Sequence, residues 1–219
     1  MIKKISYKDQ IYEHLRQALI TGEMKTGEIY SEQMIADKLK VSRTPVREAI
    51  LQLRFENLVD VFSGRGFSVR PIHFCDIQQI LQARTAIESA SLRALIVGLD
   101  TAEGQEILQQ MEICVKQDMP ATLADKNNYN FMQADMEFHM LSVLFTGNEF
   151  FVQIMNMMRT RLEQAIFNSL NRQHRNLAAI AEHEKIFSAV KFRDTDSAVH
   201  ALIAHMTTTE NILRDMISD

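Results

Sequence analysis

The chain has 219 residues, enough for one large domain or two modest ones, and 46% of them are hydrophobic. No apolar run reaches the roughly 18–20 residues of a membrane helix, and the basic N-terminus lacks the apolar stretch of a signal peptide. We therefore expect a cytoplasmic protein with no membrane partner. Its two cysteines, Cys75 and Cys114, lack metal-type spacing and are expected to be free thiols.

The formal net charge of −4 is unevenly distributed. Residues 1–72 hold twelve basic and nine acidic residues, a net of +3, whereas residues 73–219 hold twelve and nineteen, a net of −7. A mildly basic head on an acidic body is compatible with nucleic acid binding at the head. Because Pro71 follows the last predicted strand of the head, we predict two domains, residues 1–72 and 73–219.

The first part of the chain predicts three helices. Residues 7–21 place Ile11, Leu15 and Leu19 on one face, and a turn-rich link over residues 22–30 follows. Ser31 is the expected cap of a second helix over residues 31–40, and Ser42 is the expected cap of a third over residues 43–58.

The third helix carries Arg43, Arg47 and Arg54 on the face opposite its apolar stripe. Two short helices that meet at a tight turn, with arginines on the outer face of the second, are typical of a helix-turn-helix. From the spacing alone, an equally good interpretation is that these arginines form an ordinary solvated helix face.

A wing is predicted next, with strands over Val59–Phe62 and Phe67–Val69 and a turn over residues 63–66. An arginine near the start of the third helix can reach guanine edges or phosphates in the major groove. An arginine at the wing tip, here Arg65, can enter the neighbouring minor groove.

The rest of the chain shows no strand alternation and predicts an all-α helical bundle. Helices are expected over residues 76–97, 101–117, 126–145, 149–171, 177–193 and 195–217. The predicted fold class is therefore mostly α, with an N-terminal winged helix-turn-helix followed by a C-terminal helical bundle.

Five of the seven histidines lie between residues 139 and 205. Asp135 and His139 share a helix face, and His183 and His205 fall in the middle of two further predicted helices. Three imidazoles and one carboxylate from three helices suit a divalent transition metal: zinc or nickel fits best, and iron or manganese stays open. The alternative is that His183 and His205 are core or exposed histidines without a ligand role.

The head resembles the winged-helix domain of the GntR family of bacterial regulators. The resemblance rests on VSRTPVREAI at residues 41–50 and on the GRGF wing at residues 64–67. It implies that Arg43 and Arg47 contact DNA, with Thr44 and Gly64 or Arg65 beside them. Many relatives carry a further DNA-contacting arginine early in the second helix, where this chain has Gln33.

The body resembles the FCD effector domain of FadR-type members of that family. DMEFHMLSVLFTGN at residues 135–148 matches its central motif, and IAEHEKIFSAV at residues 180–190 and His205 continue the pattern. The resemblance implies that a metal is held by four residues: Asp135, His139, His183 and His205. In that family a small carboxylate effector often completes the coordination, so the resemblance implies such a ligand here as well.

Arg84, in the opening helix of the body, is a candidate partner for the effector carboxylate. The alternative is an internal ion pair with Glu88, four residues further along. Arg159 and Arg161 are weaker candidates, and Asn148 is expected to cap a helix. His174 and His200 fall outside the motif, His174 as a loop residue.

These features together predict a homodimeric transcription regulator, in the usual case a repressor, that binds a pseudo-palindromic operator in double-stranded DNA. A small organic acid at the metal centre would control it. One alternative is a metal-responsive regulator, in which the ion itself is the signal. A metal-dependent hydrolase is the other, although the chain has no HExxH pattern and no positioned acid or base.

Overall fold

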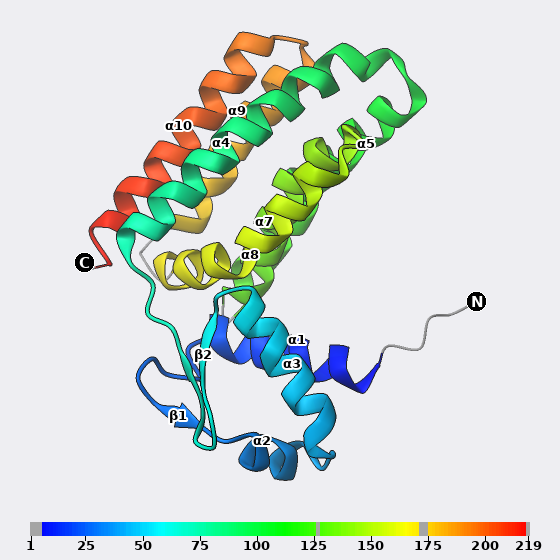
Figure 1. Ribbon diagram of the computed structural model, residues 1–219. Coiled ribbons are helices and arrows are strands. Elements are labelled where there is room, and N and C mark those ends of the chain that lie inside the picture. Colours follow the sequence, from blue (N-terminus) through cyan, green and yellow to red (C-terminus); the bar gives the residue numbers. More distant parts are fainter. Residues whose placement is uncertain (1–5, 126–127, 171–174, 218–219) are drawn as a thin grey trace. The chain divides into compact units, whose positions relative to one another are not determined.

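A computed structural model describes residues 6–125, 128–170 and 175–217. The chain divides into two compact units, Met1–Ile72 and His73–Asp219, and each is described by itself. The predicted fold class is confirmed: the first unit carries a small three-stranded sheet beside its helices, and the second is helical throughout the part that the structure describes (Figure 1).

The first unit, which we call the head, contains α1 (Tyr7–Ile20), α2 (Glu32–Leu39) and α3 (Arg43–Phe55). Ser31 caps α2 by accepting a hydrogen bond from the Met34 backbone, as predicted. Lys40 then takes a left-handed conformation (φ 54°), which turns the chain sharply into α3. Ser42 occupies the predicted cap position of α3, but its side chain makes no capping hydrogen bond.

The sheet of the head has the order β1-β3-β2, with both pairings antiparallel. β2 (Val59–Phe62) and β3 (Gly66–Val69) form the predicted wing. β1 (Ile29–Tyr30) pairs with β3 through Ile29 and Ser68, although the sequence predicted only a turn-rich link there. A two-residue strand is too short for side-chain alternation to reveal it, so this prediction was wrong for a physical reason.

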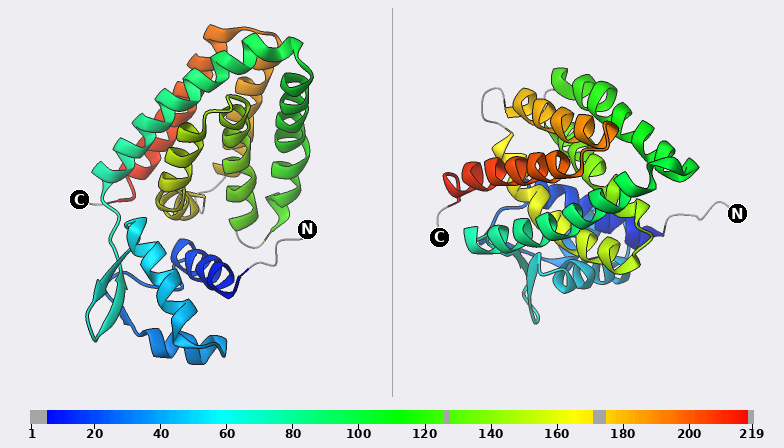
Figure 2. Two further views of the ribbon diagram at one scale, coloured as in Figure 1. Left: turned by 45° about the vertical axis from the view of Figure 1, so that its right-hand side comes forward. Right: turned by 90° about the horizontal axis from the view of Figure 1, so that it is seen from above.

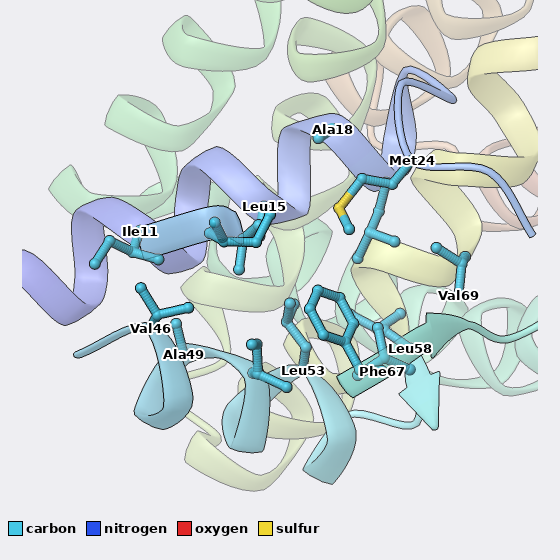
Figure 3. Packing of buried hydrophobic residues seen from close by; sticks show 14 of the residues in the cluster. Ile11, Leu15, Ala18, Met24, Val46, Ala49, Leu53, Leu58, Phe67 and Val69 are labelled. Carbon is cyan, nitrogen blue, oxygen red and sulfur yellow. The ribbon is translucent and has the colours of Figure 1, made fainter. Parts of the chain in front are cut away.

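A single apolar core joins the helices of the head to the wing. Ile11 and Leu15 of α1 face Val46 and Leu53 of α3, and Phe67 of β3 lies between Leu53 and Leu58 (Figure 3). These side chains are at most 4% exposed. The core therefore fixes the position of the start of α3 relative to the wing. Because both elements contribute to one surface of the head, this packing also fixes the shape of that surface.

The second unit, which we call the body, consists of six long helices and short connecting turns among its described residues. The long helices are α4 (Phe74–Val97), α5 (Ala102–Ile113), α7 (Tyr129–Phe145), α8 (Glu149–Ser169), α9 (Arg175–Lys191) and α10 (Thr195–Arg214). The turns are η1 (Gly98–Asp100), η2 (Cys114–Asp118), α6 (Met119–Ala121) and η3 (Thr122–Ala124).

Five of the six predicted body helices agree with the structure to within a few residues. The predicted helix over residues 101–117 is instead split, because α5 gives way to the π-helical turn η2 at Cys114. The predicted ends at residues 126 and 171 lie outside the described residues. No described helix is both long and apolar enough to cross a membrane.

Helices α4, α7, α9 and α10 enclose the interior of the body. α4 packs against α7 and α10, and α10 packs along α9 (Figures 1 and 2). α7 is buried around most of its circumference between Phe131 and Val143, as expected of a helix inside a bundle. Asp135 and His139 lie on this central helix, so the fold carries both into the interior.

Candidate functional site

A groove of about 490 Å³ runs over the outer surface of the head. Its lining comes from the start of α2, the start of α3 and the wing, and includes Arg43, Arg47, Gly64 and Arg65. Thr44 is exposed beside Arg43 but does not line the groove. The structure thus brings together four of the five residues predicted to contact DNA.

Glu32, which sequence reasoning missed, lies between the two predicted recognition arginines. Its Oε2 accepts from Arg43 Nη2 at 3.2 Å and from Arg47 Nη2 at 2.8 Å, and Arg47 Nε lies 3.1 Å from both oxygens. Hydrogen bonds from Arg47, and then from Arg43, hold the pKa of Glu32 below its usual value. The carboxylate therefore occupies donors of both arginines.

Gln33, adjacent to Glu32, donates from Nε2 to Asp37 Oδ1 at 2.7 Å and also lines the groove. This side chain is therefore neutral and bonded to a carboxylate of its own helix. It adds no positive charge to the groove.

In the body, the structure brings together the four residues predicted to bind metal. The candidate ligand atoms of Asp135, His139, His183 and His205 all lie within 4.8 Å of one another, and all four residues are buried. His139 Nε2 is 3.0 Å from His183 Nε2 and 3.2 Å from His205 Nε2. Asp135 Oδ1 is 3.4 Å from His183 Nε2. We call this set the three-histidine cluster.

Each imidazole of the cluster makes a hydrogen bond through Nδ1, the ring nitrogen on the side away from the other two rings. His139 Nδ1 donates to Glu88 Oε2 and His205 Nδ1 donates to Glu182 Oε2, each at 2.7 Å. His183 Nδ1 donates to the Ala179 carbonyl, also at 2.7 Å. A carboxylate or carbonyl oxygen can only accept, so a neutral ring must carry its proton on Nδ1 and turn an Nε2 lone pair inward.

Burial favours the neutral form of His139 and His183. It lowers the pKa of His139 well below its ordinary value, and the nearby Arg84 guanidinium adds to the effect. Burial also lowers the pKa of His183, with a further contribution from His205. Neutral imidazole is the form that binds metal.

The spacing of the nitrogens fits a single ion. Bonds of about 2.0–2.1 Å place neighbouring ligand nitrogens about 2.9 Å apart in octahedral coordination and about 3.3 Å apart in tetrahedral coordination. The separations of 3.0 and 3.2 Å fall within that range. Three converging lone pairs repel one another unless a cation lies between them, so the donor set and its orientation suit a divalent transition metal.

A small cavity of about 10 Å³ adjoins the cluster, which is near the least volume that holds one water molecule. Asp135 and His205 line it, together with Arg84 and Arg175. Arg84 is 1% exposed and donates from Nε to Glu88 Oε1 at 2.7 Å, so the predicted alternative, an ion pair with Glu88, is present. Its Nη2 is nevertheless buried without a hydrogen-bond partner.

Sequence reasoning missed Arg175 as a residue of this cavity. Its guanidinium donates to both oxygens of Glu182, at 2.9 and 3.2 Å, and to Thr209 Oγ1 at 3.3 Å. It falls between two predicted helices, in a polar stretch that we read as a loop, so the sequence gave no signal of burial; the residue is only 8% exposed.

Of the other residues named from the sequence, the four that the structure describes do not line the cavity. Arg159 pairs with Glu163, and Arg161 pairs with Asp76; neither lines the cavity. Asn148 Oδ1 accepts from the backbone of Phe150 and Phe151, which confirms the predicted helix cap. His200 is exposed, and His174 lies outside the described residues.

Comparison with known protein families gives two matches. Residues 79–208 match the FCD domain, and residues 7–69 match the bacterial regulatory proteins of the gntR family. The first match covers more than half of the chain.

Individual proteins agree with these matches. An uncharacterized HTH-type transcriptional regulator, YdhC of Bacillus subtilis, is 25% identical over 93% of this chain and 89% of its own. The gluconate operon transcriptional repressor of Bacillus licheniformis is 24% identical over 92% of this chain and 83% of its own. The solved structure of E. coli McbR/YncC shares the fold, with a TM-score of 0.79 and 19% identity over 97% of this chain and 99% of that one.

Proposed function

Because this chain belongs to the GntR family of bacterial regulatory proteins and carries an FCD domain, we propose that it is a metabolite-controlled repressor. The family and the relatives are DNA-binding transcription regulators and not enzymes. What the proposal adds is a repressing role, a metal centre, and a small organic acid as the controlling ligand.

The groove of the head supports DNA contact by Arg43, Arg47, Gly64 and Arg65, with the exposed Thr44 beside Arg43. Arg47 and Arg65 bring guanidinium groups to one surface from α3 and from the wing. Guanidinium forks suit guanine edges and phosphates, and Gly64 (φ 72°) lets the wing turn tightly at its tip. Two such heads in a homodimer would read the two halves of a pseudo-palindromic operator.

The observation that carries the ligand proposal is the cavity beside the three-histidine cluster. Asp135, His139, His183 and His205 would hold a divalent metal, with zinc or nickel preferred for this nitrogen-rich set. When bound, the metal supplies an open coordination position for an anionic oxygen. Arg84 would supply the second contact, because its unpartnered Nη2 can donate to a carboxylate.

A gluconate operon repressor among the relatives supports both an acid as ligand and repression as the effect. The cavity is close to water-sized, so an acid can enter only as the surrounding side chains move apart. A ligand that binds one arrangement of the body better than another shifts the population toward it, and this is how binding can change operator affinity.

The deciding experiment is selection of genomic fragments on the full-length protein, followed by sequencing of the retained DNA. We expect a short palindrome upstream of an operon for catabolism of an organic acid, and release of that DNA when the acid is added. If no sequence is retained above background, whether zinc and candidate acids are present or absent, the proposed operator and the proposed repression are both refuted.

The metal centre has its own test, because His183 and His200 lie on neighbouring helices but differ in burial. We expect His183→Ala to lose bound zinc as measured by mass spectrometry of native protein. His200→Ala should keep the full metal content. Equal metal content in the two variants would refute the ligand set.

A further inference from the structure

Two carboxylates outside the three-histidine cluster each bridge an arginine and a histidine. Glu88 accepts from Arg84 Nε through Oε1 and from His139 Nδ1 through Oε2, both at 2.7 Å. Glu182 accepts from Arg175 Nη1 through Oε1 at 2.9 Å and from His205 Nδ1 through Oε2 at 2.7 Å. The same arginine–glutamate–histidine arrangement therefore occurs twice, on different helices.

The glutamate end of each arrangement fixes the orientation of a metal-facing ring. Glu88 and Glu182 can only accept from Nδ1, which leaves the Nε2 lone pairs of His139 and His205 facing the centre. A carboxylate behind an imidazole also makes its free nitrogen a stronger donor to a metal. His183, by contrast, is held by a backbone carbonyl and needs no side chain for the same purpose.

The arginine of each arrangement reduces the free-energy cost of removing the glutamate charge from water. Burial raises the pKa of Glu88 above its usual value, and the charge and hydrogen bond of Arg84 offset only part of that rise. For Glu182, burial acts in the same direction, but hydrogen bonds from His205 and Arg175 bring its pKa below the usual value. Each arginine also lines the cavity, so each carboxylate links a cavity residue to a ring of the cluster.

We propose that Glu88 and Glu182 are positioning residues of the metal centre, each held by a cavity arginine. This inference rests on the proposed metal site and deepens it, because neither carboxylate belongs to the predicted ligand set. Its consequence is that metal affinity depends on two residues that do not touch the ion.

The test is zinc affinity of the full-length protein, measured by competition with a chromogenic chelator. Glu88→Gln and Glu182→Gln keep the size of the side chain and one oxygen but remove the charge. We expect each variant to bind zinc about 10–100-fold more weakly than the unmodified chain.

Glu163→Gln is the matched control. Glu163 is fully buried and accepts from Arg159 at 2.7 Å, four residues away, as Glu88 does from Arg84. Two of the side chains that bond to it, Arg159 and Gln133, do not belong to the cluster. We expect this variant to bind zinc within about threefold of the unmodified chain, because the loss of a buried ion pair affects stability rather than ligand orientation.

A second readout is the visible absorption spectrum after loading with cobalt(II). We expect the bands of Glu88→Gln and Glu182→Gln to shift, because the rings become weaker donors, while those of Glu163→Gln coincide with the unmodified chain. If Glu88→Gln fails to fold by circular dichroism, Glu182→Gln decides the matter, since its side chain is 19% exposed.

Three results distinguish the possibilities. Weaker zinc binding and shifted bands in the two variants, but not in the control, support the positioning role. Unchanged zinc affinity in both variants, with an unmodified chain that binds zinc, overturns that role and leaves the metal site standing. Failure of the unmodified chain to bind zinc, nickel or cobalt overturns the metal site and the positioning role together.

Discussion

Arg47 and Arg54 are both exposed residues of α3, but only Arg47 lines the groove of the head. We expect Arg47→Ala to weaken operator binding by about 1–3 kcal/mol, roughly 10–100-fold, because a guanidinium contact to a base or phosphate is lost. Arg54→Ala should bind within about threefold of the unmodified protein. Fluorescence anisotropy with the selected operator measures both, and equal losses would contradict the assignment of Arg47.

Glu32 holds Arg43 and Arg47 in the absence of DNA, and its charge opposes any approaching phosphate. Removing that charge in Glu32→Gln should raise affinity for random-sequence DNA about two- to fivefold, the scale of an exposed ion pair. Operator affinity should rise less, because the arginines also lose the contact that orients them. The ratio of the two affinities at fixed salt is the measurement, and an unchanged ratio would contradict a role for Glu32 in selectivity.

The wing depends on a close approach between two strands at Gly66. A Cβ added there would lie 2.1 Å from the Tyr30 carbonyl oxygen of β1, and the residue has φ +117°. We expect Gly66→Ala to destabilise the head by at least about 3 kcal/mol, because backbone atoms on both sides must shift.

Gly64, in the same turn, is the control. It also has a positive φ (+72°), but a Cβ there meets nothing within 4 Å. Gly64→Ala should therefore cost only about 1–2 kcal/mol of left-handed strain. Urea unfolding followed by tyrosine fluorescence measures both, since three of the four tyrosines lie in the head and the chain has no tryptophan. Equal costs would show that β1 does not pack against Gly66.

At the level of the whole chain, the two units should respond differently to metal. Every proposed ligand belongs to the body, so bound metal stabilises that unit alone. Zinc at a hundred times its dissociation constant contributes about 2.7 kcal/mol, equivalent to roughly 5–10 °C for a unit of this size. A chelator should lower the body's transition by that amount and leave the head's unchanged.

Circular dichroism and tyrosine fluorescence distinguish the two transitions, because most helical residues are in the body and most tyrosines are in the head. Equal shifts in both signals would contradict a metal confined to the body. An unchanged circular dichroism transition would contradict a stabilising metal.

The sequence by itself determined most of the elements, β1 and the split at η2 excepted, and many of the residues of interest. Helical periodicity predicted α1, α2 and α3, and the glycines of the wing predicted the turn between β2 and β3. Spacing along one helix was enough to place Asp135 and His139 on a common face. These features are local, since they depend on residues a few positions apart whose relation is fixed by helix or strand geometry.

Only the tertiary structure decided which distant side chains meet. Glu32 reaches Arg47 across a turn, Glu182 bonds to His205 on the next helix, and Ile29 pairs with Ser68 in the sheet. Such contacts depend on how packed elements are placed and on which buried polar groups need partners. The family resemblance pointed to the proposed ligands, but no period or spacing in the sequence encodes the contacts that orient them.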